Sequence, residues 1–119
     1  MIVKGLDHVY YWTRDMEKAV AFYRDVLGLS LSRRDGDNWA EFDAGSVRFA
    51  VHGVVEGHPV QPGGGTAVFE VEDVDRARRM LEERGVEFGH SADVAGYARY
   101  ATFLDPDGNT VQIIQYVRA

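Results

Sequence analysis

His8 is the side chain in this sequence with the widest chemical scope. It follows Asp7 in the stretch DHVYYW, where most neighbours are apolar or aromatic. An imidazole in such a strand has several roles open to it: a metal ligand, a general acid or base with an unperturbed pKa of about 6.5, a hydrogen-bonding group in an aromatic pocket, or a satisfied histidine of the core. As a base it needs an orienting partner, and Gln112 or a strand neighbour are the candidates.

Aromatic residues are the second chemical feature. Strand and helix periodicity predicts two layers of them. One layer faces the helices as core and contains Tyr11, Phe22, Tyr23 and Phe69. The other faces a cleft and supplies most of the predicted ligand-binding set, which is His8, Tyr10, Trp12, Phe42, Phe49, Phe103, Gln112 and Tyr116. A face rich in rings suits a flat, largely apolar ligand, although the same rings could simply fill the cleft.

The remaining polar candidates have simpler interpretations. Glu41 opposite Arg48 is either a cross-strand surface pair or a charged pair at the mouth of a cavity. The other histidines, at a strand end (His52) and in loops (His58 and His90), are expected to be solvated. Asp105 and Asp107 are interpreted as turn formers. The sequence contains no glycine-rich phosphate loop, nucleophile elbow or HExxH motif.

These side chains need a framework of strands and helices to hold them. Periodicity and capping residues predict strands over 6–12, 29–32, 39–42 and 47–52 in the first half, with a helix over 16–27 after the first strand. In the second half they predict strands over 66–71, 86–89, 99–104 and 110–116, a helix between Asp73 and Gly85, and a loop over 90–98. Residues 105–108 (DPDG) are a type I turn signal. The hairpin register places Glu41 opposite Arg48 and Ala40 opposite Phe49.

The two halves repeat one plan. A slide of 58 residues places His8 on Thr66 and Asp15 on Asp73, and a slide of 63 places Phe49 on Gln112. The prediction is an α+β fold of tandem βαβββ modules, with module one at 1–52, a linker at 53–65 and module two at 66–119, because each half leaves a sheet face that only another sheet can cover. We expect them to form a single domain spanning 1–119.

Composition narrows the classes of function. The chain has 119 residues, no cysteine and a formal net charge of −6. The negative charge argues against nucleic-acid binding, which needs a concentrated basic face. Without a long apolar run or a cysteine, we expect no membrane partner, no disulfides and a cytoplasmic location.

Three stretches together resemble the vicinal oxygen chelate superfamily, which includes glyoxalase I, methylmalonyl-CoA epimerase, extradiol dioxygenases, and fosfomycin and bleomycin resistance proteins. They are DHVYYWTRDMEKAVAFYRDVLGL, VEDVDRARRMLEERGV and FLDPDGNTVQIIQ. The resemblance covers nearly the whole chain. It implies curved mixed sheets around a cleft with the helices outside, and a homodimer that completes or shares the cavity.

The resemblance also implies where a metal would bind. Metal-dependent members take ligands from the first and last strands of each module, and these positions correspond to His8, Phe49, Thr66 and Gln112. One imidazole and one amide fall short of the three or four donors that a tight divalent site needs. No metal or other cofactor is therefore expected. A divalent metal would require His8, Gln112 and a carboxylate such as Glu41, turned inward by a different register.

Three hypotheses about function follow. The leading one is a small-molecule-binding protein of the resistance or sequestration type, which holds an aromatic or largely apolar compound in the cleft between the modules without a standard metal site. The alternative is a glyoxalase-like lyase, an isomerase or epimerase, or a dioxygenase that uses His8 as a metal ligand or general base. The third is a dimerisation or regulatory module whose cleft is filled.

Overall fold

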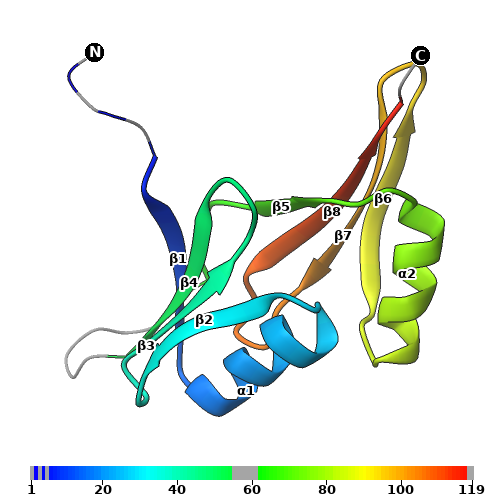
Figure 1. The fold of residues 1–119 in the computed structure, drawn as a ribbon. Coiled ribbons are helices and arrows are strands. Elements are labelled where there is room, and N and C mark those ends of the chain that lie inside the picture. Colours follow the sequence, from blue (N-terminus) through cyan, green and yellow to red (C-terminus); the bar gives the residue numbers. More distant parts are fainter. Residues whose placement is uncertain (1, 3, 5, 55–61, 118–119) are drawn as a thin grey trace. The chain divides into compact units, whose positions relative to one another are not determined.

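Two compact units, each with one four-stranded mixed sheet, make up the part of the chain that the structure describes (Figure 1). The computed structural model describes residues 2, 4, 6–54 and 62–117. Unit 1 is Met1–Gln61 and unit 2 is Pro62–Ala119. Both units have the order strand, helix, three strands, so the predicted tandem βαβββ fold is confirmed. No helix in the described ranges is long and apolar enough to cross a membrane.

Unit 1 is built from β1 (His8–Thr13), a helix, and the strands β2 (Ser30–Asp35), β3 (Trp39–Asp43) and β4 (Arg48–Gly53). Its sheet has the order β1-β4-β3-β2. The pair β1 and β4 is parallel, and the other two pairs are antiparallel. The first and last strands of the unit are therefore neighbours in the sheet, which places β1 side chains beside those of β4.

The helix of unit 1 changes its winding part of the way along. α1 (Met16–Val20) begins at Asp15, whose carboxylate accepts a hydrogen bond from the Lys18 backbone N–H at 3.1 Å. It continues as a π-helical segment, Ala21–Val26, after which the Leu27 N–H still reaches five residues back to the Phe22 carbonyl. Gly28, at φ +87°, ends it. The predicted extent of the helix is confirmed, whereas its π winding was not foreseen.

The core of unit 1 lies between this helix and one face of the sheet. Tyr23 is fully buried, and its ring centroid lies 4.7 Å from that of Phe49 and 5.8 Å from that of Phe42. Phe42 and Phe49 are therefore core residues beneath the helix. The prediction that they face a cleft is wrong.

The reason is the register between β1 and β4. Tyr10 pairs with Ala50, just as Val68 pairs with Gln112 in unit 2, so Ala50 rather than Phe49 corresponds to Gln112. A shift of one residue moves a side chain to the opposite face. In the hairpin Glu41 lies opposite Ala50, two residues from the predicted register. Because Ala50 lies beside Tyr10, Glu41 is on the face of His8, whereas the predicted register placed it on the opposite face.

Unit 2 repeats this topology with the sheet order β5-β8-β7-β6. Its strands are β5 (Ala67–Glu70), β6 (Phe88–Val94), β7 (Ala98–Leu104) and β8 (Thr110–Tyr116), and its helix is α2 (Val74–Glu83). Asp73 caps α2 by accepting a hydrogen bond from the Arg76 N–H at 3.1 Å. Strand β6 runs through most of the predicted loop over 90–98, because residues beyond an irregularity between Phe88 and Ser91 pair with β7.

Phe103 is also a core residue and does not lie on a cleft face as predicted. It is 1% exposed, and its ring meets Phe88 at 5.1 Å between centroids. Thr102 pairs with Gln112, whereas Phe103 pairs with Val111. Because neighbours along a strand point to opposite faces, Phe103 lies on the face opposite Gln112.

The turn between β7 and β8 forms as predicted. The Gly108 N–H donates to the Asp105 carbonyl at 3.0 Å, and Gly108 has a φ of +86°. The Asp105 carboxylate is buried and accepts hydrogen bonds from the backbone of Asp107 and Asn109 and from the Asn109 side chain. The turn is thus held by its own side chains.

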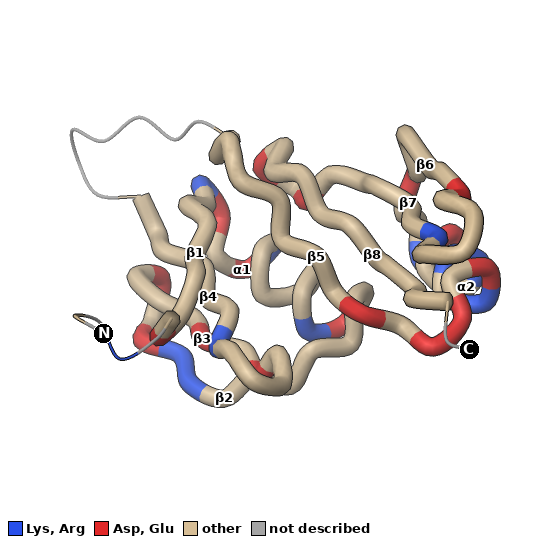
Figure 2. The backbone as a smooth tube through the Cα atoms, turned by 90° about the horizontal axis from the view of Figure 1, so that it is seen from above, with Lys and Arg blue, Asp and Glu red and all other residues tan. Residues whose placement is uncertain are grey.

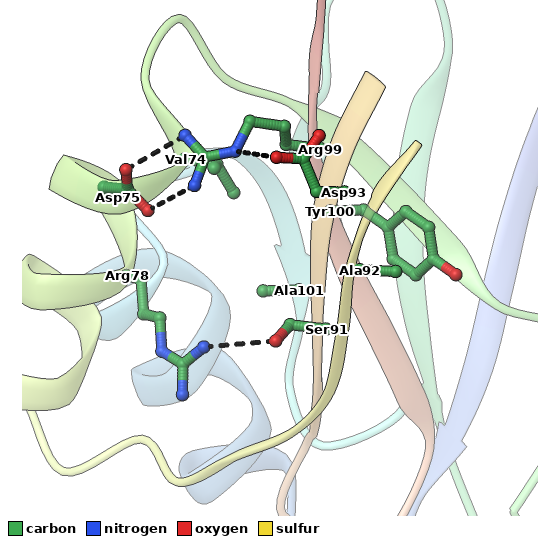
Figure 3. Close-up of a pocket in the computed structure, with 9 residues that line it drawn as sticks. All are labelled: Val74, Asp75, Arg78, Ser91, Ala92, Asp93, Arg99, Tyr100 and Ala101. Carbon is green, nitrogen blue, oxygen red and sulfur yellow. Dashed lines mark hydrogen bonds and ion pairs between the residues drawn. The ribbon is translucent and has the colours of Figure 1, made fainter. Parts of the chain in front are cut away.

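Charged side chains anchor α2 to its sheet. α2 is rich in arginine and glutamate, whereas β1 and β8 contain no Lys, Arg, Asp or Glu (Figure 2). Arg99 of β7 makes two hydrogen bonds to Asp75, at 2.9 and 3.0 Å, above a cavity of about 240 Å³ between α2, β6 and β7 (Figure 3). The hydrogen bond from Arg99 is the main cause that lowers the pKa of the Asp75 carboxyl.

Gly53 offers a test of the packing in unit 1. A Cβ at this position would collide with the backbone of Asp37 and Asn38, whose carbonyl accepts from the Gly53 N–H at 2.8 Å. We expect Gly53→Ala to lower the free energy of unfolding by about 1–3 kcal/mol. Gly89→Ala in β6 is the matched control, because its Cβ would meet only the Thr102 carbonyl at 3.8 Å. Equal urea midpoints for the two variants would contradict the close approach at Gly53.

The Asp75–Arg99 pair predicts a pH-dependent coupling. Because its pKa is lowered in the folded state, Asp75 stabilises the fold above its unfolded pKa and loses this contribution as the pH falls through the folded value. A double-mutant cycle with Asp75→Asn and Arg99→Met should give a favourable coupling at pH ~7 that shrinks below pH ~4. A coupling independent of pH over this range would contradict the prediction.

Candidate functional site

Five rings gather on the face of the unit 1 sheet that points away from α1. They form what we call the ring cluster: His8, Tyr10, Trp12, Trp39 and His52. The three from β1 share a face because strand side chains alternate. Trp39 pairs with His52, and His52 pairs with Trp12, so the register brings the other two rings to the same face. All five side chains are at least partly exposed.

The rings meet mostly at steep angles. The Tyr10 ring lies 5.7 Å from Trp12 at 78° and 5.6 Å from Trp39 at 61°, and the Trp39 ring lies 5.5 Å from His52 at 88°. Trp12 and His52 are the closest pair, with centroids 4.3 Å apart. Such edge-to-face contacts are the favoured geometry of aromatic pairs. They keep the rings in a defined arrangement while leaving ring faces accessible, and Tyr10 is 42% exposed.

Ala50 is the floor of the ring cluster. It belongs to β4, between β1 and β3, and is fully buried. Over it the rings of His8 and Trp39, from two strands that are not neighbours, approach to 5.5 Å. A methyl side chain is small enough to lie beneath this contact, whereas a longer one would separate the rings.

A chain of ionic contacts borders the ring cluster. The Asp7 carboxylate lies 2.7 Å from His8 Nδ1 and 2.6 Å from Arg48, and Arg48 also contacts Glu41 Oε1 at 3.3 Å. The hydrogen bond from His8, followed by the charge of Arg48, lowers the pKa of the Asp7 carboxyl. Asp7 is therefore an acceptor near neutral pH, so Nδ1 of His8 donates and the neutral ring presents Nε2 as an acceptor.

The structure separates the predicted ligand-binding residues into groups. His8, Tyr10 and Trp12 lie together in the ring cluster. Phe42, Phe49 and Phe103 lie in the cores. The other two are in unit 2, where Gln112 donates to the Thr102 hydroxyl at 3.3 Å and Tyr116 meets Tyr97 at 5.7 Å between ring centroids.

The sequence interpretation missed two members of the ring cluster and the role of Asp7. The sequence pattern predicts a strand at Trp39 without indicating a function, and it predicts a solvated His52. Strand periodicity contains the signal for both residues. Trp39 lies two residues from Glu41, and His52 lies two residues from Ala50, so the members of each pair share a face of the sheet. Using that signal requires the β1–β4 register, which aligns Trp12 with His52.

The side chains at the superfamily's metal positions do not fit a divalent ion. With the observed register these positions are His8, Ala50, Thr66 and Gln112. An alanine supplies no donor, and the Gln112 amide is engaged with Thr102. Glu41 and His52 do share the face of His8, yet within the described residues no three His, Asp or Glu side chains are placed to hold a metal ion.

Comparisons with known proteins agree with this fold. The family model of the glyoxalase/bleomycin resistance protein/dioxygenase superfamily matches residues 5–113. A protein of Mycolicibacterium smegmatis is 32% identical over 97 residues, covering 82% of this chain and 81% of the relative. YraH of Bacillus subtilis is 32% identical over 113 residues, covering 83% of this chain and 88% of YraH.

Solved structures give the same result. TnmS3, an antibiotic binding protein from a Streptomyces species, superposes with a TM-score of 0.80 at 24% identity, covering 98% of this chain and 99% of TnmS3. A lactoylglutathione lyase from Agrobacterium tumefaciens superposes with a TM-score of 0.78 at 21% identity, covering 95% and 94%. At these identities the likeness shows the fold alone. The match of the family model over most of the length shows that the chain belongs to the glyoxalase/bleomycin resistance protein/dioxygenase superfamily.

Proposed function

We propose that this protein binds a small aromatic or largely apolar molecule on the ring cluster of unit 1, without a standard metal site, in the manner of a resistance or sequestration protein. The observation that carries the proposal is the exposed Tyr10 ring, which has four other rings within 6.1 Å between centroids. A group of exposed rings supplies area on which a ligand can stack, and soluble proteins rarely leave such an apolar patch exposed unless it binds something. The antibiotic binding protein TnmS3, which has the same fold, supports this class of function.

The rings also explain why a flat ligand is favoured. Aromatic pairs gain energy beyond their buried area, by an amount that corresponds to roughly threefold to tenfold in affinity for each pair. A saturated molecule of similar size buries comparable area but has no π system to stack. The ring cluster should therefore bind a planar aromatic molecule more tightly than a saturated molecule of the same size.

The test compares 2-naphthol with decahydro-2-naphthol by isothermal titration calorimetry. We expect the planar probe to bind at least about fivefold more tightly, and Tyr10→Ala to weaken its binding about fivefold. Tyr97→Ala is the matched control because Tyr97 is an exposed tyrosine of unit 2, 59% exposed, and contacts a single described ring, Tyr116. Failure of both probes to bind, or equal loss in both variants, would reject the ring cluster as the site.

A second candidate function is general acid–base catalysis by His8. The observation that favours it is the 2.7 Å contact between His8 Nδ1 and the Asp7 carboxylate, which supplies the orienting partner that a catalytic imidazole needs. With Nδ1 donating to Asp7, Nε2 is the atom available to take a proton. The corresponding reaction class is proton abstraction from a carbon next to a carbonyl, as in an isomerase, epimerase or lyase.

Solvent deuterium exchange into 2-tetralone, followed by NMR, tests this alternative. If His8 is a base, His8→Gln should slow the protein-catalysed exchange about 100-fold or more, with binding of the ketone retained. His90→Gln is the control, since His90 also pairs with a ring, Tyr100, at 5.7 Å between centroids, but lies in unit 2. Exchange that is unaffected by His8→Gln, or absent in the wild type, would exclude this role for the ketone.

We further propose that the protein forms a homodimer, as the family resemblance implies. We also propose a cytoplasmic location, which the cysteine-free composition supports. Analytical ultracentrifugation tests the homodimer, because a dimer should sediment with about twice the 13.3 kDa mass of one chain.

A further inference from the structure

The three electron-rich rings of the ring cluster are arranged as intersecting walls. Tyr10 stands at 78° to Trp12 and at 61° to Trp39, with centroid separations below 6 Å. The face of each ring carries negative potential, and Trp and Tyr attract cations most strongly. A positively charged group at this surface can therefore approach the faces of more than one ring.

The formal charges on the same face are predominantly negative. Register and contacts place four carboxylates there, against two guanidinium groups, among the described residues: Asp7, Asp35, Glu41 and Asp43 against Arg33 and Arg48. Arg48, which borders the ring cluster, is itself held by two carboxylates, at 2.6 Å from Asp7 and 3.3 Å from Glu41. Its charge is thus balanced within the protein and does not leave a positive surface for an anionic ligand.

Glu41 is the carboxylate nearest the centre of this face. It lies opposite Ala50, which in turn lies opposite Tyr10, so it borders the floor of the ring cluster. Its side chain is 12% exposed. Within the described residues its only side-chain partner is Arg48, through Oε1, which leaves Oε2 available to accept from a ligand. A largely buried carboxylate interacts with a charge more strongly than an exposed one.

We infer that the ligand of the ring cluster is an organic cation, in which an aromatic group carries a quaternary or tertiary ammonium centre. This inference rests on the proposed function, because it names the chemical class of the molecule bound at the same surface. The rings of Tyr10, Trp12 and Trp39 contact the ammonium group and the aromatic part, and Glu41 supplies the opposite charge.

Three matched probes test the inference on the wild-type protein. They are 3-hydroxyphenyltrimethylammonium, its neutral isostere 3-tert-butylphenol and the anion 3-hydroxybenzenesulfonate, each titrated by calorimetry. We expect the cation to bind about tenfold more tightly than the neutral isostere, and the anion to bind most weakly. Fluorescence gives the location, because Trp12 and Trp39 are the only tryptophans of the chain and both lie in the ring cluster.

Each outcome has one meaning. A cation preference accompanied by a change in tryptophan fluorescence supports the inference. Equal or tighter binding of the neutral isostere, or of the anion, overturns it and leaves the proposed function intact. Failure of these three probes together with 2-naphthol overturns both.

A variant pair tests the part assigned to Glu41. Glu41→Gln should reduce the preference for the cation over its isostere from about tenfold to about threefold, because the counter-charge is lost while the rings remain. Asp75→Asn is the matched control, since Asp75 is also a carboxylate paired with one arginine, in unit 2, and should leave the preference unchanged. An unchanged preference in a folded Glu41→Gln protein would remove Glu41 from the site.

Discussion

The parallel register between β1 and β4 determines what unit 1 can do. It sets Tyr10 beside Ala50 and Trp12 beside His52, and the antiparallel pairing of β3 then adds Trp39 to the same face. The opposite face receives Phe42 and Phe49, which pack on Tyr23 of the helix. Because side chains alternate along every strand, this one register separates the core of the unit from the ring cluster.

The chemistry of the face follows from what the register excludes as well as from what it assembles. The last-strand position of unit 1 that corresponds to a metal ligand in the superfamily holds an alanine, and the imidazole of His8 is hydrogen-bonded to Asp7. In the proposed function, the rings of this face, including two imidazoles, and the carboxylate of Glu41 recognise the ligand. They suit a ligand held by its aromatic surface and charge, and the superfamily is one in which a single fold supports several unrelated functions.

Much of the fold could be predicted from the sequence because local signals were strong. Asp15 and Asp73 cap equivalent helices, and the DPDG turn forms around Gly108. The site was harder, because it depends on pairing between strands 40 residues apart, and no local signal in Phe49 or Ala50 says which of them lies beside Tyr10. An apolar residue fits either face when both are partly covered. The π-helical winding of Ala21–Val26 also has no recognised signature in its sequence.

Ala50 occupies a position at which one substitution could add a metal ligand. One base change converts any alanine codon into a codon for aspartate or glutamate, so a single mutation can install a carboxylate at the strand position that corresponds to Gln112. Such a side chain has no room beneath the His8 and Trp39 rings as they stand. The mutation therefore leads toward an ion-binding descendant only in a lineage that first loses the Trp39 ring, because His8 would itself be a ligand. The order of substitutions thus governs which functions are reachable.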